Sequence, residues 1–358
     1  MQAAFDMTSA TLRTLGLLLG AWLALRGLGS GPGGSAAGFV ISAALVLLIA
    51  LVVVGTGKTG PASFSLSKYL AFVAPLLVGQ LLLNLLLQAD LTLLGRFASE
   101  AARAEGAPLT RADALVGAYR ATQMFAFLPY QVLIGITFIL FPMLAAAALA
   151  GDTAAIARYV RMGVRIALLI AGAMVSVTVG LGPRLLALLF GEEAAALGGR
   201  SLGLLALGFG CFAIFGILTT VLNSLGRERQ SAGVTGFAVA VVAMLCFGRV
   251  RGAPLGEELL WLTAQATTTG LLSATLLAAV LVYRAAGAVT SASTLLRTLL
   301  SLAVAASFAR LAFPPGKLLT LVAAGLTPLV FMGVLILTRE LGKADLQLIW
   351  TVIRRRAS

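Results

Sequence analysis

The chain of 358 residues contains no histidine and only two cysteines, Cys211 and Cys246. Without an imidazole there is no histidine general base, no histidine metal ligand and no Ser-His-Asp triad. Both cysteines stand in apolar runs and lack CxxC spacing, so we interpret them as small buried hydrophobic residues. We therefore expect no metal and no cofactor.

Charge is also scarce, since charged residues make up 11% of the chain against 60% hydrophobic residues. A water-soluble surface on a chain of this size needs far more charge. The composition predicts an all-α, polytopic integral membrane protein, and the 40 glycines suit helices that pack closely in lipid. Asp6 precedes the first apolar run and no basic segment leads into it, so we expect no cleavable signal peptide.

A membrane-spanning helix needs about 20 mostly apolar residues. Ten segments meet this requirement, at approximately 11–28, 36–55, 68–90, 117–148, 162–182, 196–223, 231–249, 258–283, 291–313 and 317–338. The fourth contains Pro129 and Pro142, which predicts that it kinks or partly leaves the bilayer. Residues 96–113 carry six charged side chains and are expected to form the longest polar loop.

The net charge of +13 is attributed to basic residues that set membrane orientation. With the N-terminus in the cytoplasm, fifteen Lys and Arg lie inside and eleven outside, so both termini are predicted to be cytoplasmic. No aromatic–basic cluster accompanies the charge, and we expect no nucleic-acid partner. The stretch "GTGKTGPASFS" at 55–65 lacks the spacing of a phosphate-binding loop and is interpreted as a linker.

The stretch "GQLLLNLLLQADLTLLGRF" at 79–97 places polar side chains inside an apolar run. Gln80, Asn84 and Gln88 are four residues apart and share one face of a helix. They either bond neighbouring helices, with roughly 1 kcal/mol or less each, or form one wall of a hydrated cavity, which we favour. Asp90 lies off this face near the expected helix end, where it is either interfacial or paired with Arg96 or Arg120.

Polar residues recur at 117–143, where Arg120, Gln123 and Tyr130 fall on one side of a helix. Arg120 either extends to the membrane interface or helps to form an anion-attracting site. Arg297, inside a later span, presents the same choice. No acid–base pair, nucleophile or metal cluster can be assembled from the sequence, so we do not expect an enzyme.

Four long motifs give the chain a family resemblance. "VGAYRATQMFAFLPYQVLIGITFILFPMLAAA" resembles the eighth helix of oligosaccharide (O-antigen and polysaccharide) flippases in the multidrug/oligosaccharidyl-lipid/polysaccharide exporter superfamily. "LLFGEEAAALGGRSLGLLALGFGCFAIFGILTTVLNSLGRERQSA" is similar to the stretch around their tenth helix, and "GQLLLNLLLQADLTLLGRF" to their seventh. "LLTLVAAGLTPLVFMGVLILTRELGKADLQLI" is similar to their last helix and tail.

The resemblance implies two helical bundles around a cationic central cavity. Such a protein passes an undecaprenyl pyrophosphate-linked oligosaccharide across the bacterial cytoplasmic membrane by alternating access, for polysaccharide or lipopolysaccharide biosynthesis. By this analogy the substrate-binding candidates are Asp90, Arg120, Gln123 and Arg297, with a polar wall formed by Gln80, Asn84 and Gln88.

The family usually has twelve to fourteen helices, and the start "MQAAFDMTSATLRTLG" resembles the approach to the fifth. We expect a late gene start, a natural fragment or a chain completed by a partner. Residues 1–58 would be a two-helix remnant of the first bundle, 67–286 the six-helix second bundle and 288–340 an extra helix pair. Residues 341–358 are expected to be a basic cytoplasmic tail, either amphipathic on anionic lipid or solvated.

Two alternatives to an oligosaccharide flippase stay open. One is a lipid II flippase or a multidrug exporter of the same superfamily. An exporter of cations would need an acidic cavity, whereas arginines outnumber Asp90, which favours an anionic substrate. The other is a non-transporting membrane scaffold in a polysaccharide assembly complex. Membrane lipids, a second copy of the chain and polysaccharide assembly proteins are the expected partners.

Overall fold

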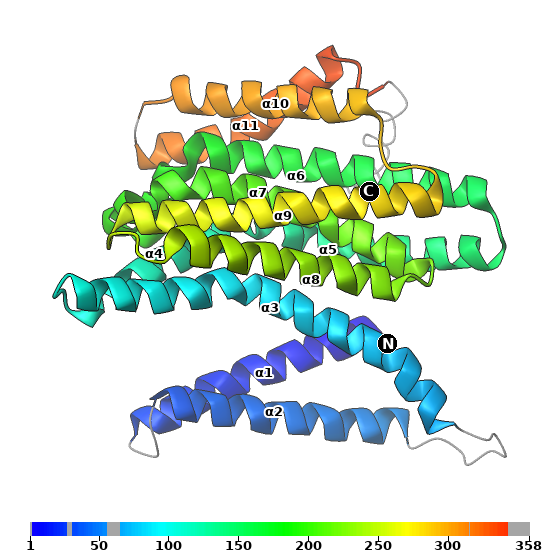
Figure 1. Cartoon of the computed structure of the whole chain (residues 1–358), viewed down its shortest axis with the longest axis horizontal. Coiled ribbons are helices and arrows are strands. Elements are labelled where there is room, and N and C mark those ends of the chain that lie inside the picture. Colours follow the sequence, from blue (N-terminus) through cyan, green and yellow to red (C-terminus); the bar gives the residue numbers. More distant parts are fainter. Residues whose placement is uncertain (1, 27–30, 56–64, 315, 343–358) are drawn as a thin grey trace, which may run out of the picture. The chain divides into compact units, whose positions relative to one another are not determined.

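The computed structural model describes residues 2–26, 31–55, 65–314 and 316–342 (Figure 1). Helices account for nearly all of these residues, which include no strand. Ten of the helices formed by the described residues are long and apolar enough to cross a membrane. The prediction of an all-α, polytopic membrane protein is thereby confirmed. The chain divides into two compact units, Met1–Leu66 and Ser67–Ser358, which are considered separately.

The first unit is a helix pair whose backbones touch at glycines. It consists of α1 (Gln2–Leu25) and α2 (Gly31–Val54). A Cβ atom added at Gly38 would lie 2.0 Å from the carbonyl oxygen of Gly16, and one at Gly20 would lie 2.1 Å from that of Gly34. No side chain fits at such distances. The four-residue spacing within each glycine pair places both contacts on one face of each helix, as in close helix pairs in lipid.

The second unit is a helical bundle around α7. Its members are α3 (Leu66–Ala104), α4 (Leu109–Ala126), α5 (Leu128–Leu149), α6 (Thr153–Phe190), α7 (Glu192–Ser224), α8 (Glu228–Leu245), a π-helical turn (Cys246–Val250), α9 (Glu257–Ala286), α10 (Ala292–Leu311) and α11 (Lys317–Leu337). The central helix α7 packs against α4, α5, α6 and α9. Helices α10 and α11 pack on each other and on α6 (Figure 1).

The position of α7 follows from its composition. Its buried residues are distributed around the whole helix and include Phe209, Phe212 and Phe215 alongside several glycines. A helix that is apolar on every side is buried within its domain. The glycines allow close approach: a Cβ added at Gly208 would lie 2.7 Å from the hydroxyl of Thr268 on α9.

The segment predicted at 117–148 is broken into two helices. Helix α4 ends at Ala126 and α5 begins at Leu128, with Pro129 in the first turn of α5. Proline lacks an N–H and clashes with the preceding helical turn, so a helix can begin with it more readily than continue through it. The predicted kink is confirmed here, whereas Pro142 remains inside α5.

The prediction of a polar loop at 96–113 is wrong. Helix α3 continues to Ala104 and α4 begins at Leu109. Three of the charged residues, Arg96, Glu100 and Arg103, lie on the exposed face of α3, where Arg96 Nε is 2.9 Å from Glu100 Oε1 one turn later. Phe97, Ala98 and Ala102 are buried on the opposite face. Residues 96–104 are therefore the amphipathic end of a helix, which a search for long apolar runs does not detect.

Two predictions concern residues outside those that the structure describes. The tail from residue 343 onward lies entirely outside them, as does most of the linker predicted at 55–65. Both remain predictions, as does the cytoplasmic location of the termini.

Candidate functional site

Asp90 of α3 is the centre of a buried polar cluster in the second unit. Its exposed fraction is 1%, and its carboxylate accepts hydrogen bonds from side chains of two other helices. Tyr119 of α4 donates to Oδ2 at 2.9 Å and Thr267 of α9 donates to the same oxygen at 3.0 Å. The backbone N–H of Leu91 donates to Oδ1 at 2.8 Å. These donors replace the water that a buried carboxylate loses.

The predicted span 68–90 placed Asp90 near a helix end, and this prediction is wrong. Helix α3 extends fourteen residues beyond Asp90, to Ala104. The suggested pairing with Arg96 or Arg120 is also wrong. Arg96 pairs with Glu100, and among the described residues Asp90 forms no ion pair. A neutral side chain separates Asp90 from Arg120 instead.

That neutral side chain is Gln123, which is 4% exposed. Its amide nitrogen donates to both carboxylate oxygens of Asp90, at 3.2 and 3.3 Å. Its amide oxygen accepts a hydrogen bond of 2.8 Å from Arg120 NH1. The two ends of the amide thus have partners of opposite kind, and this arrangement determines which end is oxygen and which is nitrogen. A continuous path of hydrogen bonds runs from exposed Arg120 to buried Asp90.

Arg120 and Gln123 line a pocket of about 550 Å³ at the break between α4 and α5. This volume lies within the range of small-molecule sites, roughly 300–1,000 Å³. Gln88 of α3 and Gln131 of α5 add two more amides to the polar side. The remaining lining is apolar and includes Phe125, Phe127, Leu128, Leu189, Phe190 and Phe209. Discontinuous helices in transporters commonly form substrate sites of this kind.

Aromatic rings pack edge to face along the apolar side of this pocket. The ring centroids of Phe125 and Phe190 are 5.9 Å apart, and those of Phe127 and Phe209 are 5.5 Å apart. These pairs connect the α4–α5 break to α6 and α7. The pocket is therefore amphipathic, with one guanidinium and amides on one side and packed aromatic and aliphatic side chains on the other.

The predicted polar stripe on α3 contributes one residue to the pocket. Gln80, Asn84 and Gln88 are all exposed, as expected for one helical face. Gln88 lines the pocket, whereas Gln80 and Asn84 are absent from its lining. Asn84 donates to the backbone carbonyl of Gln80 at 2.9 Å, a bond within the same helix. The role of this face as a hydrated wall remains a prediction.

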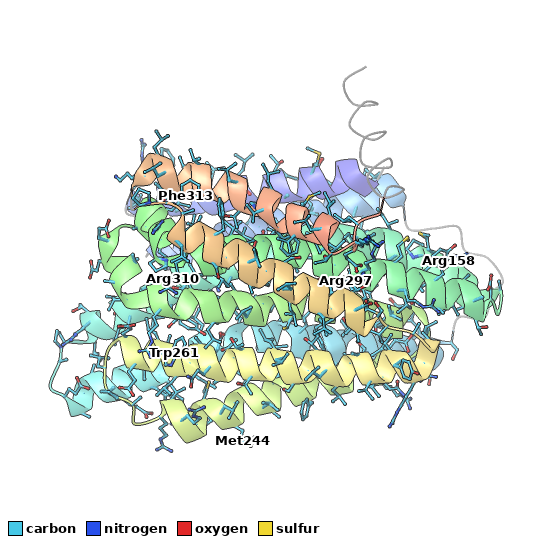
Figure 2. All side chains as sticks on the ribbon, turned by 90° about the horizontal axis from the view of Figure 1, so that it is seen from above. Arg158, Met244, Trp261, Arg297, Arg310 and Phe313 are labelled. Carbon is cyan, nitrogen blue, oxygen red and sulfur yellow. The ribbon has the colours of Figure 1, made fainter. Side chains whose placement is uncertain are left out.

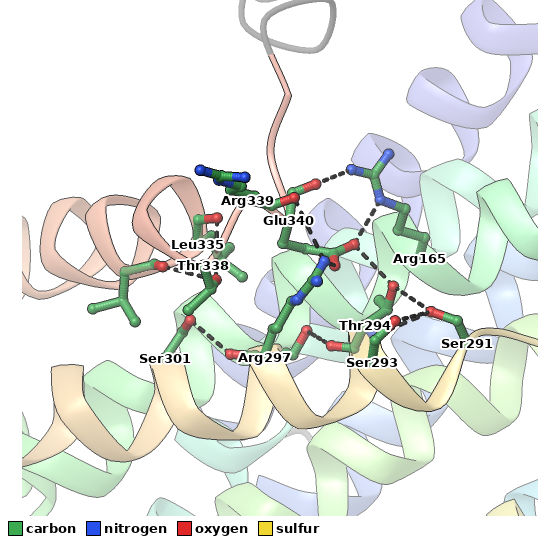
Figure 3. A network of polar contacts seen from close by, with 12 residues as sticks. Arg165, Ser291, Ser293, Thr294, Arg297, Ser301, Leu335, Thr338, Arg339 and Glu340 are labelled. Atoms are coloured by element: carbon green, nitrogen blue, oxygen red, sulfur yellow. Dashed lines mark hydrogen bonds and ion pairs between the residues drawn. The ribbon is translucent and has the colours of Figure 1, made fainter.

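Arg297 belongs to a different polar cluster, which Figure 3 shows. Its NH1 is 3.2 Å from Glu340 Oε2, and Nε of Arg165 is 3.0 Å from Glu340 Oε1. Thr294 donates to the same Oε1 at 2.9 Å. Glu340 is 7% exposed and follows the last turn of α11. Figure 2 shows Arg297 on α10, and the structure does not bring it to the pocket.

Sequence reasoning missed Tyr119, Thr267 and Glu340. Tyr119 is next to Arg120 in the sequence. Thr267 lies in "TAQATTTG" at 263–270, and this polar run inside an apolar span is a signal that could have identified it. Glu340 gave no signal, since it is one acid beyond the last apolar segment. Among the residues with described positions, no group of three or more Asp, Glu, Cys or His forms a candidate metal site.

Comparison with known proteins identifies a shared fold. No protein-family model matches the chain, and no curated protein matches it by sequence. A solved structure described as the lipid II flippase MurJ, in an inward closed conformation, aligns with a TM-score of 0.67 at 13% sequence identity. The alignment covers 93% of this chain and 67% of that one. The chain thus has a fold similar to that of MurJ.

Proposed function

We propose that this protein is a flippase-type transporter that moves an anionic, lipid-linked saccharide across the bacterial cytoplasmic membrane by alternating access. The observation that carries the proposal is the amphipathic pocket at the α4–α5 break, where Arg120 and three amides face packed aromatic side chains. This combination matches a molecule with a charged, sugar-bearing head and an apolar chain.

Each side of the pocket suits one part of such a molecule. The planar guanidinium of Arg120 can bind phosphate oxygens through two parallel hydrogen bonds. The amides of Gln88 and Gln131 can donate to and accept from sugar hydroxyls. Phe127, Leu128 and Leu189 offer an apolar surface for the first isoprenoid units. Gln80 and Asn84 extend the polar surface along α3 toward its start.

Charge favours an anionic substrate over a cationic one. Arg120 is exposed, while Asp90 is buried and already accepts four hydrogen-bond donors. A cationic drug entering the pocket would meet Arg120 first. We therefore favour lipid-linked export over multidrug export.

An undecaprenyl pyrophosphate-linked oligosaccharide is the proposed cargo, for polysaccharide biosynthesis. Lipid II is the second candidate, because the protein with the matching fold is described as a lipid II flippase. Both cargoes present a pyrophosphate between an isoprenoid and a sugar. The pocket chemistry supports this shared part of the molecule.

The test compares binding of farnesyl pyrophosphate and farnesol to the purified protein in detergent. These probes share an isoprenoid and differ in the anionic group. Arg120→Gln removes the charge but keeps a polar side chain, and we expect roughly tenfold or greater loss of farnesyl pyrophosphate affinity, since a charge-assisted hydrogen bond contributes about 1.5–3 kcal/mol. Farnesol binding should not change.

Arg297→Gln is the matched control, because Arg297 is also a predicted site arginine but lies in the Glu340 cluster. It should bind both probes like the wild type. Unchanged farnesyl pyrophosphate binding by Arg120→Gln would contradict the proposal, as would an equal loss for both arginine variants.

A further inference from the structure

Arg120 and Arg297 are held by different kinds of partner. Arg297 and Arg165 contact the carboxylate of Glu340 directly, so the carboxylate offsets part of their charge. Arg120 contacts an amide oxygen, and the carboxylate of Asp90 lies on the far side of that amide. The charge of Arg297 is thus partly offset by a carboxylate in direct contact, whereas Arg120 has no carboxylate in direct contact.

We propose that Gln123 is a positioning residue that orients Arg120 without neutralising it. Asp90 holds the amide nitrogen of Gln123, which turns the amide oxygen toward Arg120 and directs the guanidinium at the pocket. The positive charge stays available for the anionic head group. This inference rests on the proposed function and explains how the pocket stays cationic beside a buried acid.

Few side chains can serve as this link. The link must accept a hydrogen bond from a cation and donate one to a carboxylate, which the amide of glutamine does with two separate atoms. Glutamate at 123 would accept from Arg120 but would face Asp90 with like charge. Lysine would donate to Asp90 but has no acceptor for Arg120. Methionine would fill a similar volume and make neither bond.

Burial stabilises the hydrogen bonds between Asp90 and Gln123. Gln123 and Asp90 are 4% and 1% exposed, so water does not compete strongly for their hydrogen bonds. Tyr119 and Thr267 occupy Oδ2 of Asp90, which limits rotation of the carboxylate. Gln123 is therefore held from one side and presents its oxygen to Arg120 from a fixed position.

The decisive comparison uses two variants that both place a carboxylate beside Arg120. Gln123→Glu adds a negative charge, whereas the double variant Asp90→Asn/Gln123→Glu has the same net charge as the wild type and moves the carboxylate one step closer to Arg120. In the double variant, an asparagine amide can still donate to Glu at 123 and accept from Tyr119. We expect both variants to lose farnesyl pyrophosphate affinity by at least tenfold while they bind farnesol like the wild type.

Asp90→Asn alone removes the carboxylate on the far side of Gln123 and should bind farnesyl pyrophosphate within about threefold of the wild type, or more tightly, because an amide oxygen at position 90 can still accept the hydrogen bond from Gln123 Nε2. Gln123→Met should lose a few-fold through loss of orientation. Unchanged thermal unfolding of the double variant in detergent shows that its binding defect is not a folding defect.

Wild-type affinity for farnesyl pyrophosphate in the double variant would overturn the inference, because the position of the carboxylate would then be irrelevant. If Arg120→Gln lowers binding in the same assay, only the role of Gln123 fails and the proposed function stands. If Arg120→Gln also binds normally, both fail together.

Discussion

At the scale of single residues, Asp90 connects three helices of the second unit. Tyr119 of α4 and Thr267 of α9 both donate to one of its oxygens, while Gln123 donates to both. Helix α3 has few close backbone approaches to its neighbours, so it depends on side chains for its attachment. The carboxylate therefore stabilises the bundle and also orients the amide that faces the pocket.

Asp90→Ala should lower the stability of the protein. It removes the acceptor that the buried hydroxyls of Tyr119 and Thr267 share. These hydroxyls are 3.3 Å apart, so one can donate to the other, and the hydroxyl left unsatisfied costs about 1–3 kcal/mol. Asp90→Asn keeps an acceptor oxygen and should cost less. Thermal unfolding of the detergent-solubilised protein measures both. Equal midpoints for Asp90→Ala and the wild type would contradict a structural role for this cluster.

Part of the candidate site could be predicted from the sequence, whereas Tyr119, Thr267 and the connections between the residues could not. Asp90, Arg120, Gln123 and Gln88 were identified because polar side chains are costly in apolar segments. Thr267 lies 177 residues from Asp90 along the chain. Periodicity describes neighbours on one helix and carries no information about partners so far apart.

At the scale of helices, the apolar runs predicted the number and order of the candidate membrane-spanning helices. They predicted the ends of these helices less well. Ten spans were expected and ten candidate spans are present among the described residues. The end of α3 and the start of α4 were missed because ion-paired and alanine-rich turns are not apolar enough to detect. Pro129 did predict the break, since its geometric effect is local.

Glu340 joins α6, α10 and the end of α11, and its removal should loosen the α10–α11 pair. Glu340→Ala leaves Arg165 and Arg297 without their shared carboxylate. Breaking a buried ion pair costs about 3–5 kcal/mol, and partial exposure of both arginines reduces this to roughly 1–3 kcal/mol. A lower unfolding midpoint in detergent would reveal the loss.

Arg96→Gln is the control for that measurement. It breaks the ion pair with Glu100, whose side chains are 58% and 42% exposed. Such exposed pairs contribute about 0–1 kcal/mol, so the unfolding midpoint should barely move. Similar shifts in the two variants would show that the Glu340 cluster is an ordinary surface ion pair.

At the scale of the whole molecule, the chain combines a glycine-packed helix pair with a larger bundle that contains the pocket. The similarity to the MurJ structure extends over 93% of the chain. The saccharide carried, and whether a second copy or another protein takes part, belong to the proposed function.

The most direct test of the account is photo-crosslinking of the cargo in bacterial membranes. A benzophenone amino acid replaces Leu128, which lines the pocket. In the control it replaces Phe138, which is on the same helix, is 72% exposed and does not line the pocket. We predict capture of an undecaprenyl pyrophosphate-linked saccharide at 128 and loss of that capture in Arg120→Gln. Equal capture at 128 and 138 would contradict a head-group site in this pocket. Capture at 128 that is unchanged by Arg120→Gln would contradict it as well.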